Sequence, residues 1–167
     1  MGKKRLLFAI NTMGCGGAET ALINLIGSLS PAEYDISLYV LLDQGELISR
    51  LPAHVRLLNR RFSDISVLDK TGARHLAVTV MRKALSHGAA FTRLPYMARE
   101  GLRMVKKGAF NVEHLLWQMV ADGSARFDEP YDLAVAYLEG GATYYVANHV
   151  NARRKAAFVH VDYAQAG

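Results

Sequence analysis

The feature that most constrains this chain is a short apolar run followed by a glycine-rich turn and an amphipathic segment. Residues 6–10 (LLFAI) are too few for anything except a buried strand. Gly14, Gly16 and Gly17 follow, and leucine or isoleucine then recurs at positions 22, 25, 26 and 29, which is the spacing of one helix face. A strand, a tight turn and a helix form the first half of a βαβ unit, so a parallel sheet is expected.

The glycine turn has the features of an anion-binding element. In a βαβ unit the helix N-terminus presents free backbone N–H groups and the positive end of the helix dipole, and glycines let an anion approach closely. The dinucleotide fingerprint G-x-G-x-x-G is incomplete, because Glu19 stands where the third glycine is required. A P-loop is excluded, because no Gly-Lys-Ser/Thr follows. A tight turn that binds no ligand is the plainer alternative.

Further apolar runs predict four more strands, at residues 35–42 (DISLYVLL), 54–58 (HVRLL), 132–138 (DLAVAYL) and 155–161 (KAAFVHV). Helical segments are expected at 46–50, 74–85, 112–120 and after Gly141. The alternation predicts an α/β fold, a Rossmann-like doubly wound parallel sheet of order 3-2-1-4-5, with a helical, basic insertion over residues 60–108.

Candidate site residues follow from this strand order. Strands one and four are neighbours in it, so a second glycine turn, Glu139-Gly140-Gly141, is expected beside the first. His160 ends the last predicted strand and is expected to line the same crevice, where a functional role is as plausible as a structural one. Trp117 is expected to be a packing anchor. Asp43 ends the second strand, where dinucleotide enzymes hold the ribose, although a surface turn residue is the simpler interpretation.

Composition narrows the class of protein. The 167 residues suffice for one domain, and 51% hydrophobic residues indicate a globular chain. A net charge of +5 suggests an acidic or anionic partner. Cys15 is the only cysteine, so it forms no internal disulfide, and it is interpreted as a loop residue and not as a nucleophile. The first apolar run is too short for a signal peptide and no transmembrane span is readable, so a cytoplasmic protein, or one peripheral on the inner membrane face, is expected.

The segment from Arg93 to Lys107 (RLPYMAREGLRMVKK) is strongly amphipathic and basic. A peripheral helix with a solvated charged face explains this pattern, and an anionic membrane surface is the sharper hypothesis for a partner. Nucleic acid is not expected as a partner, because neither interleaved aromatic residues nor a binding motif accompanies the charges.

Three stretches together resemble a known enzyme family. The run M-G-x-G-G-A-E-x-x-L-x-N-L, which begins at Met13, is similar to the opening of retaining glycosyltransferases of the GT-B fold, family four. Residues 132–140 (DLAVAYLEG) and 158–163 (FVHVDY) resemble two further stretches of bacterial members. The likeness covers most of the chain except its basic middle.

The resemblance implies one half of a two-domain enzyme. Residues 1–167 would form the N-terminal, acceptor-side Rossmann-like domain, and the donor-binding C-terminal domain would be absent from them. The whole enzyme would move a sugar from a nucleotide-sugar donor to a glycan or lipid-linked acceptor in cell-surface polysaccharide or glycolipid synthesis. No metal or cofactor is expected, since helix N-termini and cations stabilise the leaving diphosphate.

The resemblance also assigns residues to roles. Catalysis would fall to His160, near the transferred sugar. The donor diphosphate would be approached by Gly14, Gly16 and Gly17, and the acceptor side would consist of Glu139, Gly140, Asp162 and Tyr163. This fragment alone is expected to be inactive. Two alternatives stay open: an NAD(P)-dependent Rossmann oxidoreductase, which Glu19 opposes, and a stand-alone flavodoxin-like binding or regulatory domain.

Overall fold

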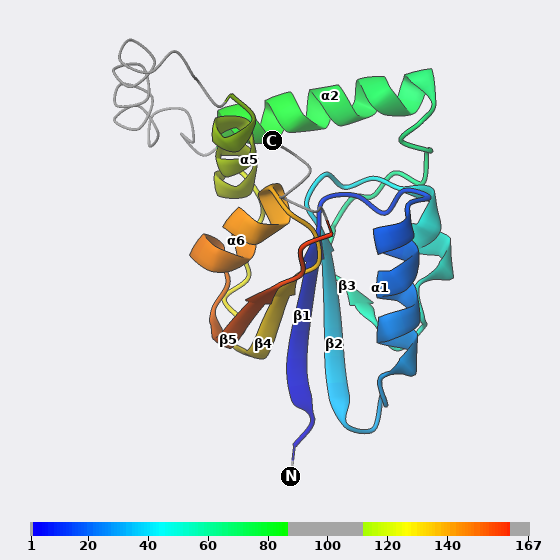
Figure 1. The fold of residues 1–167 in the computed structure, drawn as a ribbon, viewed down its shortest axis with the longest axis vertical. Coiled ribbons are helices and arrows are strands. Elements are labelled where there is room, and N and C mark those ends of the chain that lie inside the picture. Colours follow the sequence, from blue (N-terminus) through cyan, green and yellow to red (C-terminus); the bar gives the residue numbers. More distant parts are fainter. Residues whose placement is uncertain (1, 87–111, 161–167) are drawn as a thin grey trace.

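The computed structural model describes residues 2–86 and 112–160 (Figure 1). Five strands form one sheet in the order β3-β2-β1-β4-β5, and every neighbouring pair is parallel. The strands are β1 (Lys4–Ile10), β2 (Tyr34–Val40), β3 (Arg56–Leu57), β4 (Tyr131–Ala136) and β5 (Ala152–Ala157). This order confirms the predicted Rossmann-like α/β fold.

Helices cover both faces of the sheet (Figure 1). On one face lies α1 (Gly17–Ser28), and on the other lie α6 (Gly141–His149) and α5 (Val112–Asp122). Helix α2 (Lys70–Leu85) crosses near the carboxyl ends of the strands, and a single 3₁₀ turn, η1 (Glu46–Arg50), follows β2. The basic segment from Arg93 to Lys107 lies outside the described residues.

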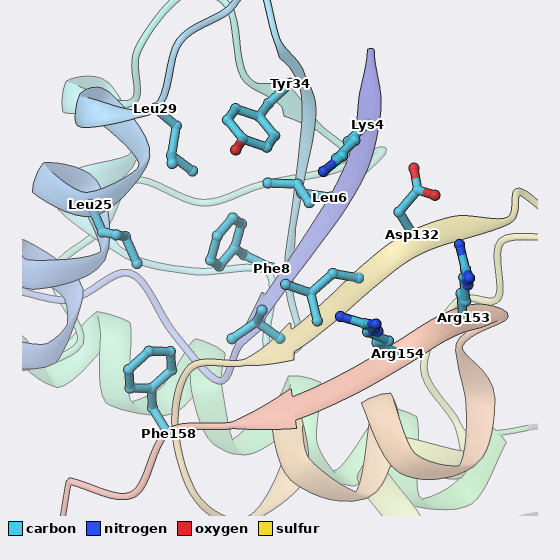
Figure 2. Close-up of a pocket in the computed structure, with 12 residues that line it drawn as sticks. Lys4, Leu6, Phe8, Leu25, Leu29, Tyr34, Asp132, Arg153, Arg154 and Phe158 are labelled. Atoms are coloured by element: carbon cyan, nitrogen blue, oxygen red, sulfur yellow. The ribbon is translucent and has the colours of Figure 1, made fainter. Parts of the chain in front are cut away.

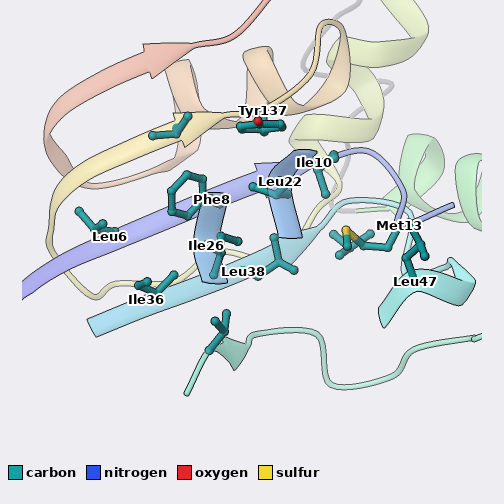
Figure 3. Close-up of a cluster of buried hydrophobic side chains, with 13 residues drawn as sticks. Leu6, Phe8, Ile10, Met13, Leu22, Ile26, Ile36, Leu38, Leu47 and Tyr137 are labelled. Carbon is teal, nitrogen blue, oxygen red and sulfur yellow. The ribbon is translucent and has the colours of Figure 1, made fainter. Parts of the chain in front are cut away.

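Each sheet face has its own apolar core, which explains why the central strands are continuous apolar runs. Leu22 and Ile26 of α1 are fully buried against Phe8 of β1 and Leu38 of β2 (Figure 3). The opposite core contains Leu7, Ala9, Tyr39, Ala142 and Tyr145. Full burial of one Leu or Ile side chain contributes roughly 1.5–3 kcal/mol, so α1 is held chiefly by these two residues.

Strand β5 differs from its prediction. It begins at Ala152, three residues earlier than expected, and it ends at Ala157. Its sequence ARRKAA lacks an apolar run, because β5 is an edge strand whose side chains, apart from the half-buried Ala152, are exposed and which is held mainly by backbone pairing with β4. Lysine and arginine are common on edge strands, where they discourage pairing with other chains.

Candidate functional site

The chain segments that follow β1 and β4 lie side by side at the carboxyl edge of the sheet. Strands β1 and β4 pair from Leu6 with Leu133 to Ala9 with Ala136, so the two segments leave the sheet at neighbouring points. Asn11, directly after β1, bonds to the second glycine turn: its Nδ2 donates to the carbonyl oxygen of Glu139 (2.8 Å), and its Oδ1 accepts from the backbone N–H of Ala142 (2.9 Å). Asn11, which follows β1, thereby caps the N-terminus of α6, a helix that follows β4.

Sequence reasoning did not single out Asn11. The available signal was a polar residue placed directly after an apolar strand and before a glycine turn. Asn11 is buried, so both of its hydrogen bonds form away from solvent, where an unpaired polar group is costly.

The three glycines of the first turn have different surroundings. A Cβ at Gly14 would lie 2.9 Å from the Val67 side chain, and a Cβ at Gly16 would collide with the Glu19 carboxylate. Gly17, the first residue of α1, has no atom within 4 Å of that position. Of the three, only Gly17 leaves room for a ligand above the helix N-terminus. Its φ is not positive, so Gly17 is not required by backbone conformation.

Carboxylates lie close to this turn. Glu19 is buried in the first turn of α1 and accepts a hydrogen bond from Thr12 Oγ1 (3.5 Å). Hydrogen bonds from its own backbone N–H and from the Ser66 hydroxyl lower the pKa of Glu46. Glu46 in turn raises the pKa of the exposed Cys15 thiol, chiefly through a hydrogen bond. A thiol whose pKa is raised is a poor nucleophile, which agrees with the interpretation of Cys15 as a loop residue.

The second glycine turn is packed beneath an indole ring. Gly140 has φ 79°, a left-handed conformation that glycine adopts without strain, and its Cβ would lie 3.1 Å from Trp117. A Cβ at Gly141 would lie 2.8 Å from the same ring. The expected role of Trp117 as a packing anchor is therefore confirmed, and the ring explains why this turn contains two glycines.

His160 lies next to the second turn. Its backbone N–H donates to the Glu139 carboxylate, and its ring is 5.3 Å from the Tyr137 ring, between centroids. The Phe158 ring stacks with the His160 ring at 6.3 Å and lies 4.9 Å from the Tyr137 ring, so the three rings form one cluster. The His160 side chain is exposed, so aromatic contacts orient an imidazole that solvent or a ligand can reach. Asp162 and Tyr163 lie outside the described residues.

Asp43 is not an ordinary surface turn residue. Its side chain is 18% exposed, it has a positive φ of 54°, and its carboxylate pairs with Lys83 Nζ at 2.9 Å and with Arg82 at 3.5 Å. Asn59 Nδ2 donates to it as well (2.6 Å). Asp43 does lie in a turn, as the simpler interpretation expects, but its carboxylate is engaged in a partly buried ion pair.

A cavity of about 610 Å³ lies on the sheet face beside α1, away from the carboxyl edge of the sheet where the glycine turns are found (Figure 2). Its walls include Leu25 of α1, Leu29 directly after that helix, Val135 of β4, Arg154 of β5 and Phe158. It contains none of the glycine turns, and it lies where α1 leaves β4 and β5 uncovered.

Comparisons with known proteins give no match: no protein-family model, curated protein or solved structure matches the chain. Over residues 2–86 and 112–160, no helix is long and apolar enough to cross a membrane. Within the same ranges, no three His, Cys, Asp or Glu side chains gather closely enough to hold a metal ion.

Proposed function

We propose that this chain is the N-terminal, acceptor-side domain of a retaining glycosyltransferase of the GT-B fold, family four. One observation carries the proposal. The second and third stretches on which the resemblance rests come together, because Glu139 accepts the backbone N–H of His160 and the Tyr137 ring lies 5.3 Å from the His160 ring. Asn11, which lies just before the first stretch, bonds to both ends of the second glycine turn. In parallel α/β sheets, ligands bind at this edge, where strand order reverses.

The donor diphosphate is assigned to the open side of Gly17. When a nucleotide sugar reacts, the bond between the anomeric carbon and the diphosphate oxygen breaks. The oxygen of the acceptor hydroxyl forms the new glycosidic bond, and the hydroxyl proton passes to the leaving diphosphate. Negative charge grows on the leaving diphosphate, and the N-terminus of α1 would stabilise it there. Gly14 and Gly16 would shape the turn, since Val67 and Glu19 occupy the space beside them.

The remaining roles belong to the second turn. His160 would contact the transferred sugar through its exposed imidazole, and Glu139 and Gly140, with Asp162 and Tyr163, would face the acceptor. The acceptor would be a glycan or a lipid-linked sugar, and the donor-binding domain would follow residue 167. An anionic membrane surface at the segment from Arg93 to Lys107 stays a prediction.

Two observations favour this proposal over a nicotinamide-dependent oxidoreductase. Glu19 stands where the dinucleotide fingerprint needs its third glycine, which serves the close packing of helix on strand. Asp43, the candidate ribose ligand, is already paired with Lys83 and hydrogen-bonded to Asn59.

The test is sugar transfer by Gly17→Val, made in the protein that includes its C-terminal domain and assayed against a panel of nucleotide sugars. Open space and a non-positive φ let the valine fit, while its branched side chain covers the N–H groups at the start of α1. We expect at least a ten-fold loss of transfer, since a charge-assisted hydrogen bond contributes roughly 1.5–3 kcal/mol.

Gly27→Val is the matched control. It places the same side chain near the other end of α1, where a Cβ would make an ordinary 3.8 Å contact with Pro52. Its transfer rate should equal that of the wild type, and the Tm of each variant separates misfolding from loss of binding. Near-wild-type transfer by Gly17→Val with an unchanged Tm would refute the diphosphate site at this turn.

A further inference from the structure

A second cavity, of about 460 Å³, lies on the sheet face opposite α1, where five cationic side chains meet a single carboxylate. The end of α2, the loop after β3 and the loop between α5 and β4 form its walls. Tyr39 and Phe127 also line it, and their rings pack edge to face at 5.3 Å between centroids. The cationic side chains are Arg60, Arg61, Arg82, Lys83 and Arg126.

The one carboxylate, Asp43, is already neutralised. It pairs with Lys83 and Arg82 and accepts a hydrogen bond from Asn59, so it offers nothing to the remaining cations. Within the part of the chain that the structure describes, Arg60, Arg61 and Arg126 form no ion pair. Three uncompensated guanidinium groups around one hollow concentrate positive potential inside it.

Lys83 holds the one carboxylate of the cavity in a fixed ion pair. Its side chain is 8% exposed, its Nζ donates to the carbonyl oxygen of Leu41, and the same nitrogen lies 3.4 Å from the Tyr39 hydroxyl. A solvated patch of lysines and arginines on a flat surface would have neither a buried, oriented cation nor an aromatic wall. Arginine also presents a planar fork of N–H groups, which matches the oxygens of a phosphate in pairs.

We propose that this cavity binds the phosphate group of a small phosphate ester, with the arginines on the oxyanion and the aromatic wall beside the organic part. Its volume lies within the usual range for small-molecule sites, roughly 300–1,000 Å³. The proposal uses none of the residues assigned to sugar transfer, so either proposal can fail without the other.

The experiment is titration of this chain, at fixed ionic strength, with glucose 1-phosphate, inorganic phosphate and uncharged glucose, followed by calorimetry and amide NMR shifts. Glucose 1-phosphate should bind and perturb amides around Arg60 and Arg126, and glucose should not. Tighter binding of the ester than of inorganic phosphate would support the ester. Equal or tighter binding of inorganic phosphate would overturn the role of the aromatic wall and with it the proposed ligand class.

The variant Arg60→Gln/Arg126→Gln should weaken glucose 1-phosphate binding at least ten-fold. The matched control is Arg153→Gln/Arg154→Gln, which removes the same charge from β5 at the opposite edge of the sheet and should change binding less than two-fold. Equal weakening by both variants would show general charge attraction and overturn the site, as would unchanged binding in the first variant. Arg61→Gln, with Tm as the folding control, repeats the test with a single exposed side chain.

Discussion

Asn11 shows how a single side chain organises the carboxyl edge. Replacing it by alanine leaves the Glu139 carbonyl and the Ala142 N–H without their partner in a buried position. We expect Asn11→Ala to lower the free energy of unfolding by about 1–3 kcal/mol, measured by urea denaturation. Asn24→Ala, on the exposed side of α1, is the matched control and should change stability by less than about 0.5 kcal/mol. An equal effect of the two substitutions would contradict the capping role.

A substitution at His160 should reduce sugar transfer without lowering the stability of the fold. Its side chain is exposed and, among the described residues, makes ring contacts with Tyr137 and Phe158, while its link to Glu139 uses the backbone N–H. His160→Ala in the protein with its C-terminal domain should therefore reduce transfer at least ten-fold and leave Tm within a few degrees, because a lost hydrogen bond to a charged group costs roughly 1.5–3 kcal/mol. His160→Phe should retain the ring contacts and still lose activity. Activity retained by the phenylalanine variant would reduce His160 to a packing residue.

Helix α2 is held by polar contacts more than by apolar packing. Val78 and Met81 are exposed, while its buried positions include Gly72, Thr79 and Lys83. Gln44 is fully buried beneath it: its Nε2 donates to the carbonyl oxygens of Gly72 and Ile65, and its Oε1 lies 3.0 Å from the His75 ring nitrogen.

Gln44→Leu keeps a buried side chain of similar size but removes these bonds. The buried carbonyl oxygens that lose their hydrogen bonds should destabilise α2. Amide hydrogen exchange in this helix should accelerate by at least ten-fold, which corresponds to a decrease of about 1.4 kcal/mol in the free energy of local opening. Amides of α1, on the other face of the sheet, serve as the internal control and should keep their protection. Equal acceleration in both helices would mean global destabilisation, contrary to a local role for Gln44.

At the scale of the whole molecule, one ion-pair network ties the amino edge of the sheet together. Glu129, before β4, pairs with Arg5 of β1 and Arg56 of β3, and Arg56 Nη1 lies 3.0 Å from one of its oxygens. Hydrogen bonding to Arg56 is the main reason that the pKa of Glu129 is lowered. The native state therefore binds fewer protons at this group than the unfolded state does. The network stabilises the fold fully when the pH is above the pKa of Glu129 in the unfolded state. This stabilisation is lost as the pH falls through the lower pKa of Glu129 in the folded state.

The corresponding prediction compares Glu129→Gln with the wild type at pH 7 and pH 3. Because the Glu129 side chain is 39% exposed, solvent screens the network, and the loss at pH 7 should not exceed about 1 kcal/mol. At pH 3, below the ordinary glutamate pKa of about 4.3, the difference should shrink towards zero. Urea denaturation at both values measures it, and a difference independent of pH would rule out an ionic contribution.

The sequence by itself determined the strand order and most element positions. Parallel strands buried on both faces must be continuous apolar runs, so residues 6–10 and 132–138 were readable as strands, and the short turn Glu46–Arg50 was placed at its observed bounds. The strand order also places the segments after β1 and β4 side by side, because β1 and β4 are neighbours. Strand β5 was misplaced because an edge strand needs no apolar pattern.

Only the tertiary structure decided what individual polar residues and glycines do. Asn11 bonds to Glu139, which lies 128 positions away in the chain, and no local pattern records such a partner. The glycines at 14 and 140 look alike in sequence, yet one packs against Val67 and the other beneath Trp117 with a positive φ. The spacing of apolar residues shows which side of a helix or strand is buried, because side chains return to the same side at the period of that element. The identity of the neighbour across the interface depends on how distant segments pack, and that is set by the fold as a whole.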